Sequence, residues 1–146
     1  LLAGVMASIL PDIDTLAFRY GVPYGSPLGH RGFTHSIAFA LASAALLTLI
    51  TRRDWRTFAF LFFCAVSHPL LDACTNGGRG VALLWPLSNH RYFAPWRPIV
   101  VSPIGRFDLH VFASELRWVW LPFACTAIAV QILWRGRSPG PAGEAS

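Results

Sequence analysis

Six aspartate and histidine side chains have the types and the spacing of metal ligands. They occur in the motifs "LPDID", "HRGFTHS" and "SHPLLDA", and they are Asp12, Asp14, His30, His35, His68 and Asp72. His68 and Asp72 are an i, i+4 pair, so on a helix they share one face and can bind the same ion. Imidazole and carboxylate ligands without a thiolate suit Zn²⁺, Mn²⁺ or Fe²⁺. We therefore expect a divalent metal as cofactor, Zn²⁺ in the first place, with one or two ions.

The two motifs nearer the N-terminus constrain the backbone. Asp12 and Asp14 project the same way if the segment after Pro11 is extended, whereas on a helix they would diverge. Alternatively, this pair is only a polar stop to an apolar segment.

The motif "HRGFTHS" stands directly before an apolar run. We expect His30 to precede the helix, Gly32 to allow a turn, and Thr34 or Ser36 to serve the first helical turn. The alternative is that His30 and His35 face lipid headgroups at the membrane interface.

Substrate contacts are expected next to these ligands. A metal ion together with a guanidinium group recognises a phosphate or carboxylate, so we assign Arg31 as an anion-binding and catalytic residue and Arg91 as a substrate contact. Asp12 is either a ligand or the general base. Thr75 and Asn76 either hydrogen-bond the substrate or end the preceding helix. A single arginine in such a chain can also simply extend its charge to the membrane surface.

Four apolar segments have to position these residues. They cover residues 1–10, 33–50, 57–74 and 118–134, and 54% of the chain is hydrophobic while 13% is charged. Soluble domains average roughly 25% charged residues. We therefore expect an all-α, multi-pass transmembrane bundle of about four spans, the first of them truncated because the chain starts inside an apolar run. A soluble protein with very apolar helices is the alternative.

The long connection between the third and fourth segments is rich in proline, glycine and aromatic residues. We expect it to form turns, with a short hairpin as an option, packed over one membrane face. The predicted organisation is an integral membrane domain over residues 1–135 and a disordered tail over residues 136–146.

Alternation across the membrane brings the three motifs together. Segment one ends at "LPDID", segment two begins at "HRGFTHS", and segment three returns with "SHPLLDA" in its last turns. All six candidate ligands then meet at one face. Ionisable groups at membrane depth are costly, and function is the usual reason for keeping them. The His68 and Asp72 pair alone could instead be a packing device within the bundle.

The net charge of +5 comes from arginine, since all 12 Lys and Arg residues are arginine. These arginines are scattered between apolar segments, so we expect membrane lipid as a partner and no nucleic acid. The oligomeric state is left open.

The motifs "LPDID", "HRGFTHS", "HPLLDACTNGG" and "LLWPLSNHRYFAPWRPIVVSPIG" occur in this order. With them the sequence resembles a family of bacterial membrane-bound metal-dependent hydrolases, described as LexA-binding inner-membrane-associated hydrolases (YdjM-like). The resemblance implies a multi-pass inner (cytoplasmic) membrane protein whose functional residues match the six ligands and Arg31. Family members usually begin with a helix bearing a "THxxxG"-like element, and this chain starts after it. No motif supports carrying over LexA as a partner.

We therefore expect an enzyme, a metal-dependent hydrolase that cleaves an ester or phosphoester in a small-molecule or lipid-linked substrate through a metal-activated water. A metal-binding transporter or sensor without hydrolytic activity is the alternative, and a structural membrane protein is a third. Transporters place ligands near the bilayer midplane. Ligands at segment ends favour the enzyme.

Overall fold

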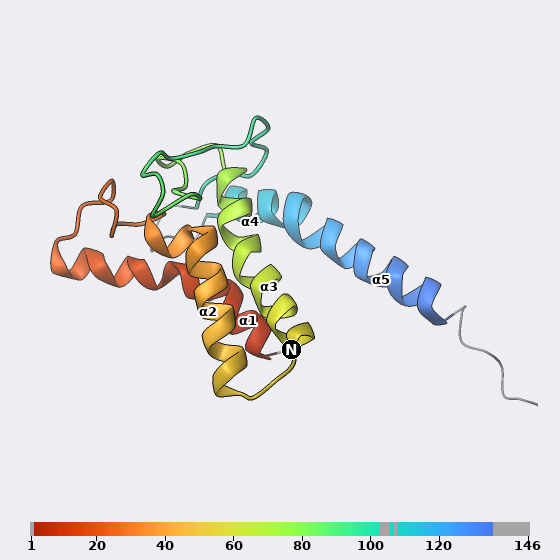
Figure 1. The fold of residues 1–146 in the computed structure, drawn as a ribbon. Coiled ribbons are helices and arrows are strands. Elements are labelled where there is room, and N and C mark those ends of the chain that lie inside the picture. Colours follow the sequence, from red (N-terminus) through yellow and green to blue (C-terminus); the bar gives the residue numbers. More distant parts are fainter. Residues whose placement is uncertain (1, 103–105, 107, 136–146) are drawn as a thin grey trace, which may run out of the picture. The chain divides into compact units, whose positions relative to one another are not determined.

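Three helices pack together to form the core of the first part of the chain. The structure is a computed structural model that describes residues 2–102, 106 and 108–135, so the predicted tail over residues 136–146 lies outside the described residues. The chain divides into two compact units, residues 1–101 and residues 102–146. The first unit contains α1 (Leu2–Ile9), α2 (Ile37–Ile50) and α3 (Trp55–Ala73). Both α1 and α2 pack on α3 (Figure 1).

Small side chains let these three helices approach closely. The buried core contains Ala7 from α1, Ala40 and Ala44 from α2, and Leu61 and Ala65 from α3. Gly4 of α1 belongs to the same interface, because a Cβ added there would lie 2.6 Å from the Phe60 ring. Helices that associate in lipid rely on such close packing of small residues, because lipid is as apolar as their side chains and hydrophobic burial gives no advantage.

Two short 3₁₀ helices precede α2, at the positions of the first two motifs. The first, η1 (Leu10–Tyr20), follows α1 directly and has Pro11 in its first turn, and the second is η2 (Phe33–His35). Of the two conformations left open after Pro11, extended or helical, the structure has the helical one. Pro11 is accepted in the first turn of a helix because its missing N–H would have no intrahelical partner there.

The second apolar segment starts its α-helix later than residue 33, which was expected to begin it. Ser36 is extended and accepts a hydrogen bond from the backbone N–H of Phe39, so α2 begins at Ile37. This confirms the predicted capping role of Ser36. Gly32 was expected to allow the turn before the helix. The residue with positive φ in this turn is Arg31, at 61°, and not Gly32. A Cβ on Gly32 would lie 2.3 Å from the carbonyl oxygen of Pro27, so glycine is needed here for close approach.

The connection after α3 is irregular, as expected. Within the described residues it holds two isolated β-bridges, Thr75 with Ile99 and Val81 with Tyr92, and no named strand, so the optional hairpin does not form. In Figure 1 this loop lies at the end of α3 opposite the turn that joins α2 to α3. The described chain is all-helical, which confirms the predicted class.

The second unit contains α4 (Leu109–Glu115), the π-helical turn η3 (Leu116–Trp120) and α5 (Leu121–Arg135). These elements are continuous, and Asp108 caps them by accepting a hydrogen bond from the His110 N–H. The helix therefore begins well before residue 118, where the fourth apolar segment was expected to start. Among the described residues, Leu109–Trp134 is the helix whose length and composition suffice to cross a membrane.

Candidate metal centre

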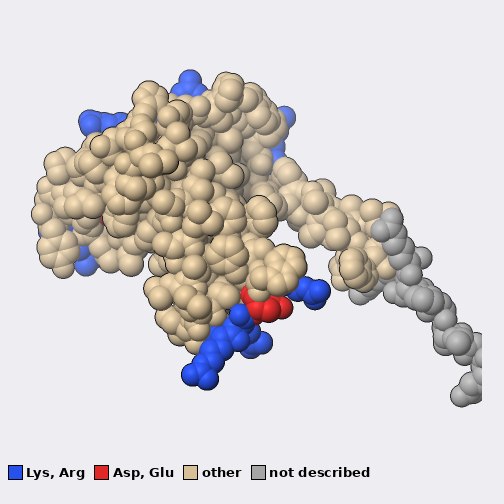
Figure 2. Space-filling model, viewed as in Figure 1, with Lys and Arg blue, Asp and Glu red and all other residues tan. Residues whose placement is uncertain are grey.

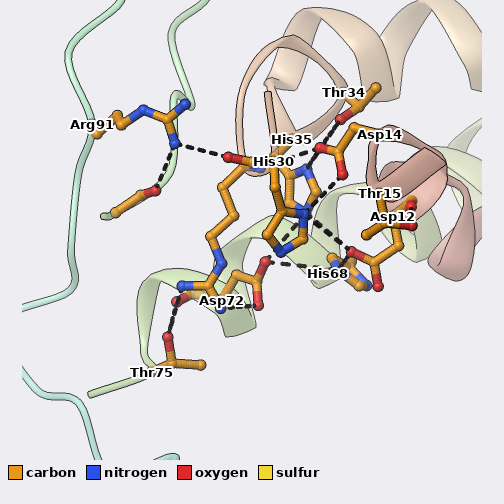
Figure 3. Close-up of polar contacts among 12 residues, drawn as sticks. Asp12, Asp14, Thr15, His30, Thr34, His35, His68, Asp72, Thr75 and Arg91 are labelled. Carbon is orange, nitrogen blue, oxygen red and sulfur yellow. Dashed lines mark hydrogen bonds and ion pairs between the residues drawn. The ribbon is translucent and has the colours of Figure 1, made fainter. Parts of the chain in front are cut away.

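The six predicted ligands converge in the first unit, at the end of α3 that lies next to η1 and η2. Figure 3 shows the labelled carboxylates and imidazoles facing one another across these elements. The rings of His30 and His35 have centroids 5.2 Å apart, and so do the rings of His35 and His68. Asp12 and Asp14 come from η1, and Asp72 lies one turn after His68 on α3.

Four atoms surround one point. The Nε2 atom of His35 lies 3.5 Å from Asp12 Oδ1 and 3.2 Å from Asp72 Oδ2. The Nε2 atom of His68 lies 3.3 Å from Asp12 Oδ1 and 3.7 Å from Asp72 Oδ2. Two nitrogen and two oxygen atoms therefore alternate around a small space.

Two of these atoms have unused hydrogen-bonding capacity. Among the described residues, His35 Nε2 and Asp72 Oδ2 are buried without a hydrogen-bond partner. Buried polar atoms are rarely left this way, so each such case needs an explanation, and binding of an ion is a common one. Both atoms belong to a group of three residues, His35, His68 and Asp72, that could hold a metal ion.

Asp14 occupies a different place in the cluster from Asp12. Its Oδ1 accepts from His30 Nδ1 at 2.8 Å, and its Oδ2 lies 3.1 Å from His35 Nδ1. The hydroxyl of Thr34 donates to the same Oδ2 at 2.6 Å, and the backbone N–H of Arg31 donates to it at 3.2 Å. The Asp14 side chain is only 1% exposed, whereas that of Asp12 is 39% exposed.

The electrostatics of the cluster follow from this packing. Burial acts to raise the pKa of Asp12, but its contacts with His35 and His68 outweigh burial and hold that pKa well below the usual range. The same holds for Asp14. Burial acts to raise its pKa, but hydrogen bonds from His30, His35 and Thr34 outweigh burial and lower that pKa. Burial lowers the pKa of His35, yet Asp12, Asp14 and Asp72 together raise it to about 10. Without a metal ion, the carboxylates are thus balanced by a proton on imidazole.

Arg31 joins two of the motifs. Its Nη2 donates to Asp72 Oδ1 at 2.9 Å, and its Nη1 donates to the Thr75 hydroxyl and to the Gly77 carbonyl. The residue is only 4% exposed. Its predicted role as an anion-binding residue stays a prediction, since both terminal nitrogens of the guanidinium already have protein partners.

The other predicted substrate contacts lie near the centre but also have protein partners. Arg91 donates to the carbonyls of Tyr24, Ser26, His30 and Gly80, which ties the loop before His30 to the loop after α3. The Thr75 hydroxyl also donates to the Asp72 carbonyl, and Asn76 Oδ1 accepts from the Val101 N–H. As substrate contacts, these three residues also remain predictions.

Sequence reasoning missed two neighbours of the cluster. Thr34 was considered only as a helix-start residue, although its hydroxyl binds Asp14. Tyr24 was not considered, and its ring meets the His30 ring edge-on with centroids 5.4 Å apart. The position of Thr34 directly before His35 was a usable signal that its hydroxyl lies near the cluster. Nothing in the local sequence pointed to Tyr24.

In the described part of the chain, all regular elements are helices, one of them is long and apolar enough to cross a membrane, and carboxylates and imidazoles meet in a buried cluster. Together these features define a class: helical proteins with membrane character and a candidate metal centre. Residues 1–138 match the model of the YdjM inner membrane protein family, and the chain belongs to that family. The YdjM-like family resemblance and the location in the bacterial inner membrane are thereby confirmed, whereas the metal-dependent hydrolase activity that the resemblance implied stays a prediction.

Two relatives from Escherichia coli (strain K12) illustrate the similarity. The inner membrane protein YbcI is 47% identical over 133 residues, which cover 84% of this chain and 77% of YbcI. The inner membrane protein YdjM is 29% identical over 136 residues, which cover 82% of this chain and 65% of YdjM. The YdjM protein of Shigella flexneri gives the same figures of 29%, 82% and 65%. No solved structure matches the chain.

Proposed function

We propose that this inner membrane protein is a metal-dependent hydrolase that cleaves an ester or phosphoester bond in a small-molecule or lipid-linked substrate. The observation that carries the proposal is the pair of buried, unpartnered atoms, His35 Nε2 and Asp72 Oδ2, which face each other at 3.2 Å beside two further donor atoms. A divalent ion held there by imidazole and carboxylate would supply Lewis acidity and an activated water molecule. Zn²⁺ fits this donor set, and Mn²⁺ and Fe²⁺ are compatible with it.

The protein residues have separate tasks in this hydrolysis. His35, His68 and Asp72 would hold the ion, at the end of α3 that lies next to η1 and η2. Asp12 has the most exposed carboxylate of the cluster, so it is placed to take a proton from an attacking water molecule. Water adds at the carbonyl or phosphoryl centre, the bond to the leaving oxygen breaks, and one proton of the water ends on that oxygen. The products are an acid and an alcohol.

We also propose that α1, α2 and α3 lie within the bilayer together with the long helix Leu109–Trp134, giving the four spans expected from the sequence. Many of their large apolar side chains are exposed: Leu2, Val5, Met6 and Ile9 on α1, Leu41, Leu46 and Leu49 on α2, and Phe60, Phe63 and Leu70 on α3. Figure 2 shows charged side chains gathered at the α2–α3 turn, while the helical surface next to it is free of charge in this view. Exposed apolar area of this extent is typical of a lipid-facing surface.

Substrate access supports a lipid-linked substrate. With α1, η1 and α3 in or at the bilayer, the exposed carboxylate of Asp12 is flanked in sequence by Ile9, Ile13 and Leu16, all of which are more than half exposed. A substrate with an apolar tail could therefore remain in the lipid while its polar group reaches the cluster.

The test uses the purified chain in detergent, with metal content measured first and hydrolysis second. We expect metal-dependent turnover of a chromogenic aryl ester or aryl phosphodiester, and we expect Asp72→Asn to lower turnover at least about 100-fold, because the variant loses a ligand. The matched control is Asp54→Asn, which makes the same chemical change on the α2–α3 turn and should leave turnover unchanged.

Equal turnover by Asp72→Asn and the unchanged chain would contradict the catalytic assignment. Bound metal without turnover of either substrate would favour the transporter or sensor alternative. Absence of bound metal in folded protein would favour a purely structural role for the cluster.

A further inference from the structure

We infer that the cluster is built for one four-coordinate ion, held by His35, His68, Asp12 and Asp72, and that Asp14 with His30 forms an outer pair that orients His35. The inference deepens the proposed function and rests on it: it sets the number of ions, which the sequence left at one or two, and the division of the six candidate ligands. Asp12, the most exposed carboxylate of the cluster, is the fourth ligand only in the resting protein; in the proposed reaction it would yield its position to the attacking water and then act as the base.

The distances between donor atoms support a tetrahedral site. Metal–ligand bonds of about 2.0–2.2 Å place the corners of a tetrahedron roughly 3.3–3.6 Å apart. The four contacts between the Nε2 atoms of His35 and His68 and the oxygens of Asp12 and Asp72 are 3.5, 3.2, 3.3 and 3.7 Å. Small adjustments of these side chains would thus complete the coordination of one ion.

The two candidate groups of ligands compete for one histidine. One group is Asp12, His30 and His35, and the other is His35, His68 and Asp72. The Nε2 atom of His35 faces both Asp12 and Asp72, while its Nδ1 faces Asp14 at 3.1 Å. A neutral imidazole offers one nitrogen lone pair to a metal, so two ions would have to share the same donor atom. One ion avoids this conflict.

Asp14 and His30 already have other partners. The Nδ1 atom of His30 is hydrogen-bonded to Asp14 Oδ1 at 2.8 Å but lies 4.0 Å from Asp12 Oδ1. Asp14 Oδ2 contacts His35 Nδ1, the atom opposite the proposed ligand atom. A carboxylate in that position fixes the tautomer and the ring orientation of a metal-binding histidine. Asp14 is therefore a positioning residue for His35, supported on its other side by His30.

Charge balance gives an independent argument. The cluster contains the three carboxylates of Asp12, Asp14 and Asp72, with total charge −3, and Arg31 contributes +1 through its ion pair with Asp72. The sum, −3 + 1, is −2, which one divalent ion neutralises. A second divalent ion would leave two positive charges at a largely buried site, which is unfavourable without further anionic ligands.

The test titrates metal-free protein in detergent with Co²⁺ and records the visible absorption of the ion together with the bound stoichiometry. We expect one Co²⁺ per chain, with the intense bands of a four-coordinate ion. His68→Ala should abolish this signal. Asp14→Asn should still bind one four-coordinate Co²⁺, with affinity lowered about 10- to 100-fold. His90→Ala, an exposed histidine in the loop after α3, is the matched control and should leave the titration unchanged.

Two Co²⁺ ions per chain would overturn the inference without the use of any variant. It would also be overturned if Asp14→Asn, folded by circular dichroism, lost the signal as completely as His68→Ala. His30→Gln gives a second route: it should still bind one four-coordinate Co²⁺, and a loss of the signal as complete as in His68→Ala would show that His30 is itself a ligand. The result is separable from the proposed function, because one bound ion without hydrolysis contradicts only the function, and two ions with hydrolysis contradict only this inference.

Discussion

At the residue scale, Arg31 shows how much of the centre depends on one backbone conformation. With φ at 61°, its N–H reaches Asp14 while its guanidinium reaches Asp72. An ordinary right-handed or extended conformation would separate these two contacts. The arrangement links the η1 carboxylate to the carboxylate on α3, so one residue holds two motifs that are far apart in the sequence.

The left-handed conformation at Arg31 predicts an unusual order of stability among variants. Arg31→Gly and Arg31→Ala both remove the ion pair with Asp72, but glycine adopts positive φ without the Cβ penalty. We expect Arg31→Gly to be more stable than Arg31→Ala by about 1 kcal/mol, measured by chemical denaturation in detergent.

Two other arginines serve as controls for this comparison. Arg52 also has positive φ, at 50°, and lies on the exposed α2–α3 turn, so glycine should again be favoured over alanine there. The neighbouring Arg53 is not among the positive-φ residues, and glycine should hold no advantage at that position. If alanine proved the more stable replacement at both Arg31 and Arg52, the conformational explanation would fail.

At the scale of the element, the start of α2 determines where His35 is held. The Ser36 hydroxyl donates to the Phe33 carbonyl at 2.6 Å and accepts from the Phe39 N–H at 3.1 Å. One hydroxyl group thus ends η2 and caps the N-terminus of α2. His35 lies between these two hydrogen-bonded turns and is fully buried.

Removing this cap should destabilise the protein measurably. We expect Ser36→Ala to lower the free energy of unfolding by about 1 kcal/mol, because the N–H of Phe39 loses its partner. The control is Ser43→Ala on the same helix, where the hydroxyl only donates back to the Ala40 carbonyl, and a change near zero is expected. A comparable loss in both variants, by denaturation in detergent, would mean that the cap itself is unimportant.

The elements also show what sequence reasoning could reach. The meeting of the three motifs followed from the alternation of apolar segments and from the i, i+4 spacing of His68 and Asp72. The 3₁₀ helix after Pro11 could not be predicted from the sequence, since the short motif "LPDID" is compatible with both an extended and a helical backbone. The contacts of Arg31 with Asp72 and of Arg91 with the His30 carbonyl also escaped prediction, because they join residues 41 and 61 positions apart. No local pattern encodes contacts of that kind.

At the scale of the whole molecule, the proposed lipid-facing surface of the first unit can be probed with charge. Leu46 on α2 is 58% exposed, and Leu87 in the loop after α3 is 92% exposed. If α2 lies in the bilayer, Leu46→Arg should cost up to about 3 kcal/mol of insertion free energy, whereas Leu87→Arg should be tolerated. The measurement is the fraction of each variant that stays in the membrane after alkaline extraction. Equal retention of the two variants would argue against a bilayer position for α2.

The uneven enclosure of the cluster has a kinetic consequence. The His35 side chain is 0% exposed, those of His68 and Asp72 are 23% and 18% exposed, and that of Asp12 is 39% exposed. An ion that binds here would enter and leave past Asp12, with His35 the last donor reached and the first released. The speed of ion exchange would then depend on this single rim carboxylate, and chelators that are too bulky to approach it would strip the protein slowly, however strongly they bind free metal.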